Sequence, residues 1–133
     1  MTKYPEILIY NLSSQKMPVK FFKETIQRIF SIFKKKYPAI SLIILPEKEM
    51  KALNYYWRHK NKSTTILTFK EGDIFLCPSV IIKQAKKRKI SLEAFYKLLL
   101  VHGVLHLFGY THDKLKDAKK MELLESKILQ SLV

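Results

Sequence analysis

Residues 92–108 constrain the fold of this chain more than any other segment, because almost every side chain in them is apolar. The run is too long for one strand, and it is shorter than the roughly 20 apolar residues that a membrane-spanning helix requires. Ser91 is a favourable N-cap in front of it, and Glu93 falls in the first turn, where the helix dipole favours a carboxylate. The sequence therefore predicts a buried helix at the centre of the fold.

Shorter segments around this helix show strand and helix patterns in turn. β-Prone runs predict strands at residues 7–10, 40–45, 64–69 and 73–77, the last two joined by a turn at Glu71-Gly72. Helical periodicity predicts one helix from Met17-Pro18 to Tyr37-Pro38, one over 46–53, one from Pro78 to Ala85, and a final one with an apolar stripe at Ala118, Met121, Leu124, Ile128 and Leu132. The pattern predicts one mixed sheet of about four strands, packed with about five helices.

The length and composition of the chain favour a single domain over residues 1–133, since 47% of the 133 residues are hydrophobic. Cys77 is the only cysteine, which excludes an internal disulfide and suits a reducing compartment. The first residues show no apolar stretch behind a basic start, so we expect no secretory signal. We expect a cytoplasmic protein without a membrane partner. The oligomeric state is open.

The chain is strongly basic: 25 Lys and Arg residues against 11 Asp and Glu residues give a formal net charge of +14. The excess is clustered at residues 34–36, 83–89 and 114–120. A field of this sign attracts polyanions and speeds their encounter with the protein. Charge by itself leaves two interpretations open, a nucleic-acid partner or a surface that merely keeps the protein soluble.

Three of the four histidines lie between positions 102 and 112, in a pattern typical of metal ligands. His102 and His106 are one turn apart on the predicted central helix, so both imidazoles project from the same face. Gly109 falls where the helix is expected to end, and a turn there lets His112 return toward the other two. Three imidazoles leave the fourth tetrahedral position of a zinc ion open, where a bound water would have a pKa near 7.

Other interpretations of this pattern remain open. A single histidine on an apolar helix is more often a core residue than a ligand, although three at this spacing are hard to explain by packing. A structural zinc site would need a fourth ligand, and Cys77 is the only cysteine that could supply it. Zinc suits an all-imidazole set, and nickel, cobalt or iron would also accept it.

The histidine spacing is shared with the metzincin proteases, which place a glutamate directly after the first histidine to activate water. This chain has Gly103 at that position, which argues against proteolysis. Met121 lies on a helical apolar stripe and is expected in the core, not in a Met-turn.

The motif from His102 to His112 resembles that of the YbeY family of bacterial endoribonucleases, H-G-x-L-H-L-x-G-Y-D-H, except at Thr111. The likeness extends upstream to Leu53-Asn54 followed by Arg58, to the strand at residues 64–69, and to Gly72-Asp73-Ile74. It covers the chain from about Leu53 onward. In two places, Thr65 and Thr111, this chain has threonine where the family usually carries aspartate.

The resemblance implies an α+β fold, one zinc ion per chain held by His102, His106 and His112, and hydrolysis of RNA in ribosomal RNA maturation. It also implies that Arg58 is catalytic, since a guanidinium fits two phosphate oxygens and stabilises charge in the transition state. The expected partners are RNA, above all ribosomal RNA, and ribosomal particles. The alternatives are a non-catalytic assembly factor with a structural zinc, or a metallohydrolase of another substrate, peptides included.

Residues around Arg58 carry lesser expectations. Tyr55, Tyr56 and Trp57 are interpreted either as a surface that stacks on unpaired bases or as half-buried packing, and packing is favoured. His59 is expected on the surface with no metal role, and Asp113 as a solvated loop residue.

Overall fold

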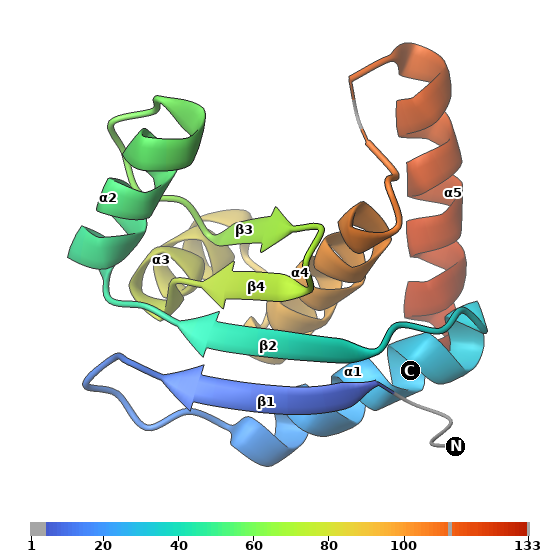
Figure 1. Cartoon of the computed structure of the whole chain (residues 1–133), viewed down its shortest axis with the longest axis horizontal. Coiled ribbons are helices and arrows are strands. Elements are labelled where there is room, and N and C mark those ends of the chain that lie inside the picture. Colours follow the sequence, from blue (N-terminus) through green and yellow to red (C-terminus); the bar gives the residue numbers. More distant parts are fainter. Residues whose placement is uncertain (1–4, 112, 133) are drawn as a thin grey trace.

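Four strands form one mixed sheet in the computed structural model, which describes residues 5–111 and 113–132 (Figure 1). The strands are β1 (Glu6–Asn11), β2 (Ala39–Ile44), β3 (Ile66–Phe69) and β4 (Asp73–Leu76). They lie in the order β1-β2-β4-β3, with β1, β2 and β4 parallel and β3 antiparallel to β4. The predicted hairpin of the last two strands is therefore confirmed, and β3 is an edge strand.

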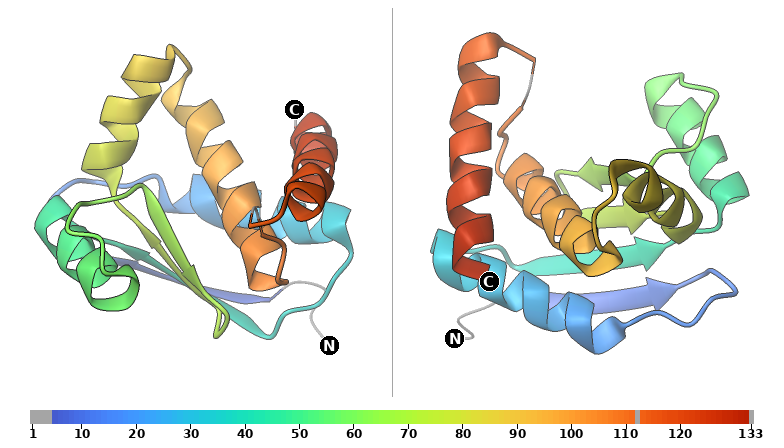
Figure 2. Two further views of the ribbon diagram at one scale, coloured as in Figure 1. Left: turned by 90° about the horizontal axis from the view of Figure 1, so that it is seen from above. Right: turned by 180° about the vertical axis from the view of Figure 1, so that it is seen from behind.

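Five helices surround the sheet in the described part of the chain: α1 (Val19–Phe33), α2 (Glu47–Arg58), α3 (Pro78–Arg88), α4 (Leu92–Leu107) and α5 (Leu115–Leu132). Helices α1, α3, α4 and α5 gather on one face, while α2 lies at the end of β2, toward the other face (Figure 2). The α+β fold predicted from the sequence, with about four strands, about five helices and a central buried helix, is confirmed.

Alternation along the strands separates two apolar clusters. Ile40, Leu42 and Ile44 of β2 point toward α1 and α4 and are completely buried in the main core. Ile43, between two of them, points to the opposite face, where it packs in a smaller cluster around Met50 of α2. Successive residues of β2 thus pack on opposite faces of the sheet, as expected for a pleated sheet with both faces covered.

Helix α4 is the centre of the main core, as its composition predicts. Its N-terminus is capped by Ser91, whose hydroxyl accepts the backbone N–H of Ala94 at 3.1 Å. At its C-terminus Gly109 adopts φ +88°, a left-handed conformation that glycine reaches without a steric penalty. The N–H of Tyr110 then donates to the carbonyl of Leu105 at 3.2 Å, closing the turn.

Three helices end elsewhere than predicted, and each ends at a non-glycine residue in the left-handed conformation. Lys34 ends α1 before Tyr37-Pro38, so this helix is shorter than predicted. His59 ends α2 after Arg58 and Lys89 ends α3 after Arg88, so these two helices are longer than predicted. Left-handed lysine and histidine residues carry no sequence signal comparable to glycine, which explains the misplaced ends.

No single helix among the described residues has the length and composition to cross a membrane. Helices α3 and α4 would meet those criteria only as a pair, and they are bent by 115° at the break between them.

Candidate functional site

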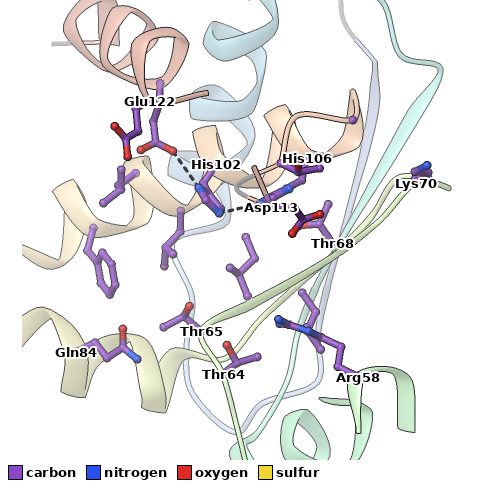
Figure 3. Close-up of a pocket in the computed structure, with 18 of the residues that line it drawn as sticks. Arg58, Thr64, Thr65, Thr68, Lys70, Gln84, His102, His106, Asp113 and Glu122 are labelled. Carbon is purple, nitrogen blue, oxygen red and sulfur yellow. Dashed lines mark hydrogen bonds and ion pairs between the residues drawn. The ribbon is translucent and has the colours of Figure 1, made fainter. Parts of the chain in front are cut away.

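A cleft of about 870 Å³ opens beside the edge strand β3. Residues 64–68 form one wall, α4 and α5 form the opposite wall, and the ends of α2 and α3 close it (Figure 3). Because β3 has a strand partner on one side only, its free edge is available to whatever enters the cleft.

His102 and His106 lie side by side in this cleft, as the predicted spacing requires. Their Nε2 atoms are 2.9 Å apart and their ring centroids 4.4 Å apart, with both residues half-buried. The rings come from successive turns of α4, so the buried helix fixes where both of them project.

Glu125 of α5 contacts the other nitrogen of His102, with 3.0 Å between Oε2 and Nδ1. In the neutral ring, Nδ1–H donates to this carboxylate, which leaves the lone pair on Nε2, the atom that faces His106. Sequence reasoning missed Glu125, since its only signal was an acidic residue on the polar face of the last helix.

The turn at Gly109 returns the chain to the cleft, as predicted. Thr111 and Asp113 both line it, and Asp113 is exposed as expected. His112, the third predicted ligand, lies outside the described residues. Over residues 5–111 and 113–132, no group of three His, Cys, Asp or Glu side chains is arranged to hold a metal ion. The complete ligand set therefore stays a prediction.

Gly103 allows α4 to approach β3 closely. A Cβ atom at this position would lie 3.0 Å from Cδ1 of Ile66 and 3.4 Å from Oγ1 of Thr68. The contact with Ile66 is tighter than ordinary van der Waals packing, so a side chain here, such as the glutamate that metzincins carry, would require Ile66 to shift.

Arg58 lines the cleft from the last turn of α2, and Figure 3 shows it on the other side of β3 from the histidines in that view. The loop after it is tied to the helix by Asn54, whose Nδ2 donates to the carbonyl of Lys62 at 2.8 Å. Asn54 is 1% exposed, and its bond to the carbonyl of the exposed Lys62 is partly buried. The prediction placed Arg58 beyond a helix ending at Leu53, and the longer helix corrects that.

Two further cations line the cleft. Lys70 follows β3, and its carbonyl accepts the hydroxyl of Tyr37, which anchors the turn. Burial, with smaller effects from the Glu71 and Asp73 carboxylates, raises the pKa of Tyr37, so this hydroxyl stays protonated to a higher pH than that of an exposed tyrosine. Arg88, at the end of α3, lies over the ring of Phe95 at 5.1 Å from its centroid.

Charge is divided across the cleft. The cations Arg58, Lys70 and Arg88 come from the sides of α2, β3 and α3, whereas the carboxylates Glu122 and Glu125 come from α5 and Asp113 from the segment before it. Of these carboxylates, Glu125 contacts a histidine ring. Thr65 and Thr111, at the two positions of family aspartates, also line the cleft.

The structure tests the remaining expectations around Arg58. Tyr55, Tyr56 and Trp57 are 58%, 72% and 58% exposed, so the favoured interpretation, half-buried packing, is wrong. All three lie in the last turn of α2, which runs to Arg58 instead of ending at Leu53. His59 is exposed, as predicted.

The core prediction for Met121 is confirmed. Met121 is completely buried, as expected for a core residue of the last helix. Cys77 is buried beneath α2 with Met50 and does not line the cleft, which removes support for it as a fourth ligand.

The histidine pair fits a metal ion by its donor chemistry. Two imidazole nitrogens bound to one zinc in a tetrahedral arrangement lie about 3.4 Å apart, half an ångström more than the 2.9 Å between these Nε2 atoms. A carboxylate on the second nitrogen is the usual partner of a metal-bound histidine. Together these features define a class of small α+β proteins in which a buried helix contributes a pair of histidines to a polar cleft.

Comparison with known proteins identifies the family within that class. The chain matches the family described as Endoribonuclease YbeY over residues 8–133. A protein called Endoribonuclease YbeY from Buchnera aphidicola subsp. Acyrthosiphon pisum (strain APS) is 39% identical over 132 residues, covering 90% of this chain and 84% of that protein. The chain belongs to the endoribonuclease YbeY family, as its histidine motif predicts.

One further relative and one solved structure are also similar to this chain. The protein of the same name from Buchnera aphidicola subsp. Baizongia pistaciae (strain Bp) is 41% identical over 100 residues, which cover 67% of this chain and 65% of that protein. The solution structure of TM1509 from Thermotoga maritima is similar with a TM-score of 0.65 and 26% identity, covering 93% of this chain and 87% of that one.

Proposed function

We propose that this protein is a metal-dependent endoribonuclease that cuts unpaired RNA, and that it acts in the cytoplasm on ribosomal RNA during maturation. The observation that carries the proposal is a single cleft, in a member of an endoribonuclease family, with a histidine pair on one wall and Arg58 on another. Hydrolases of phosphate esters need both a nucleophile-activating site and a cation for the phosphate.

The proposed metal is zinc, one ion per chain, held by His102, His106 and His112. Support comes from the paired Nε2 atoms and from the placement of Thr111 and Asp113, the chain neighbours of position 112, in the cleft. When bound, zinc supplies Lewis acidity and lowers the pKa of a water to roughly 7.

The residues of the chain have separate roles in this proposal. Glu125 keeps the proton of His102 on Nδ1, so that Nε2 remains a ligand. Arg58 binds two oxygens of the scissile phosphate and stabilises the charge that develops as one P–O bond forms and another breaks. Lys70 and Arg88 bind phosphates of the flanking nucleotides, which places an RNA strand along β3.

The test is cleavage of an unpaired RNA oligonucleotide and of a ribosomal RNA precursor by the purified zinc-loaded protein. Arg58→Ala should lower the cleavage rate about 100- to 1000-fold, since one transition-state cation is lost, without changing zinc content. Arg28→Ala is the matched control: Arg28 lies on α1 and bonds the carbonyl of Ser131, outside the cleft. His106→Ala should lose the zinc.

Each alternative function has its own outcome. A zinc-loaded protein that binds ribosomal particles but never cuts RNA would be a non-catalytic assembly factor. Cleavage of peptides without cleavage of RNA would indicate a metallohydrolase of another substrate. Cleavage of RNA that survives thorough chelation would contradict the metal-dependent mechanism.

A further inference from the structure

Two neighbouring aromatic residues on α2, Tyr56 and Trp57, are exposed to a degree that the fold does not explain. Their side chains are 72% and 58% exposed, although aromatic rings contribute most to stability when they are buried. The rings contact each other edge to face, with centroids 5.1 Å apart. Trp57 in turn contacts Phe69 at 5.5 Å, which fixes the orientation of the pair against the sheet.

The pair adjoins the proposed RNA cleft. Arg58 is the next residue after Trp57, and it lines the cleft. Phe69, which supports Trp57, is the last residue of β3, the strand whose preceding residues form a wall of the cleft. Tyr56 and Trp57 do not line the cleft themselves, and Phe69 packs in the smaller cluster on the α2 side of the sheet, so a strand reaches the pair by continuing past Arg58 onto that side.

The charge around the pair selects the occupant. Lys60 and Lys62 are exposed in the loop that follows Arg58, and Lys70 is exposed after β3, next to the exposed Glu71. The two acidic residues of α2, Glu47 and Glu49, lie in its first turn at the opposite end. Exposed aromatic rings among cations are the combination that binds single-stranded nucleic acids, because every base has a face to stack and every nucleotide carries a negative charge.

We propose that Tyr56 and Trp57 form a stacking site for an unpaired base of the RNA, adjacent to the phosphate that Arg58 binds. The inference rests on the proposed function and deepens it, because it gives a physical source for single-strand preference. A base inside a duplex has both faces covered by its neighbours, so it cannot stack on these rings as an unpaired base can. Phe69 holds Trp57 in place, so little side-chain freedom is lost on binding.

The experiment uses a natural reporter, since Trp57 is the only tryptophan of the chain. Zinc-loaded protein is mixed with an unpaired RNA of roughly 8 nucleotides, and tryptophan emission is followed by stopped flow before turnover. The comparison strands are an abasic strand of equal length and charge and a blunt duplex. Stacking predicts strong quenching by the unpaired RNA and weak quenching by both comparison strands.

Variants test the same site by affinity, measured from the polarisation of a labelled RNA. Tyr56→Leu and Trp57→Leu should each weaken binding about 5- to 150-fold, the equivalent of 1–3 kcal/mol for one stacked base. Trp57→Phe should retain most of the affinity. Tyr10→Leu is the matched control, because Tyr10 is an exposed aromatic residue on β1, the opposite edge of the sheet.

Two results would overturn the stacking site: equal quenching by the unpaired and abasic strands, or wild-type affinity in Tyr56→Leu. Tyr56 packs on Trp57 at the surface, so its variant tests the proposal without disturbing the core. Cleavage that persists while stacking fails would refute this inference alone. Normal quenching without cleavage would refute the proposed nuclease function and leave the stacking site standing.

Discussion

The contact between Glu125 and His102 is the residue-scale feature on which the proposed metal site depends most. An imidazole has two nitrogens of similar proton affinity, and only the one without a proton can bind a metal. The carboxylate of Glu125, 3.0 Å from Nδ1, decides between them in favour of a ligand at Nε2. It also fixes the plane of the ring, because α5 is packed against α4 through buried residues such as Met121.

Replacing Glu125 by glutamine should therefore weaken metal binding while the fold is retained. Glutamine keeps the size of the side chain but removes the charge that favours the Nδ1–H form of His102. We expect the zinc affinity of Glu125→Gln to fall about 10- to 100-fold. Competition with a chromophoric chelator measures it directly, without reference to activity.

Glu122→Gln provides the matched control for this prediction. Glu122 lies one turn earlier on α5 and also lines the cleft, so its variant removes the same charge from the same wall. An effect of orientation predicts a much larger loss of affinity for the Glu125 variant. Equal losses in the two variants would mean that only the overall charge of the wall matters, and would contradict the orienting role of Glu125.

At the scale of elements, α4 combines a buried tyrosine with the histidine-bearing face. Tyr96 is 3% exposed and packs on Phe22 of α1, with ring centroids 4.9 Å apart. Burial, with a smaller contribution from the Cys77 thiol, raises the pKa of Tyr96 to about 12 from the usual 10.0. The folded protein therefore keeps the phenol protonated in a range where the unfolded chain ionises it.

The stability of the protein should consequently fall between pH 10 and 12. Below pH 10 the phenol is protonated in both states and its ionisation has no effect on unfolding. Above pH 10 the unfolded chain alone gains the charge, and the free energy of unfolding decreases by about 1.4 kcal/mol per pH unit until the folded pKa is reached. Urea unfolding of wild type and Tyr96→Phe across this range measures the effect.

The comparison with Tyr96→Phe isolates this phenol from the lysines, which titrate in both proteins. The difference in the free energy of unfolding between the two proteins at pH 8, which is due to the lost hydroxyl, is subtracted at every pH first. The remaining decline should be shallower in the variant by roughly 2 to 3 kcal/mol at pH 12. Parallel declines in the two proteins would show that burial does not perturb this group.

Elements whose limits depend on local signals were predictable from the sequence. The expected helix from Leu92 to Phe108 ends within one residue of α4, because Ser91 caps it and Gly109 supplies the left-handed turn. The end of α2 was not predictable, since His59 takes the same conformation against its preference. The sequence left the aromatic residues that precede Arg58 open between a stacking surface and packing, and the structure shows them exposed.

The candidate site likewise has a part that the sequence predicts and a part that it does not. The spacing of His102 and His106 on one helix is a local relation, so the sequence was sufficient to bring them together. Glu125 reaches His102 from a different helix, and Arg88 reaches the cleft from α3. Such contacts depend on how helices pack, which periodicity does not specify.

The whole molecule carries a formal net charge of +14, and the location of that charge decides how RNA binding responds to salt. Each cation that neutralises a phosphate of a single strand releases a counterion, which contributes about −0.7 to the slope of log K against log salt. Cations away from the bound strand strengthen the overall positive field. They do not neutralise a phosphate directly, so each changes the slope by less than one contact does. The slope therefore counts contacts and separates the cleft from the rest of the surface.

Lys70→Gln and Arg88→Gln should each reduce the magnitude of the slope by about 0.7, because both side chains line the cleft. Lys20→Gln is the control: its side chain is 90% exposed on α1, outside the cleft, and its removal lowers the net charge by the same unit. Fluorescence polarisation of a labelled unpaired RNA at several salt concentrations measures all four proteins. If the three variants shift the slope equally, RNA is bound by the diffuse positive field rather than along β3, and the path of the strand through the cleft is wrong.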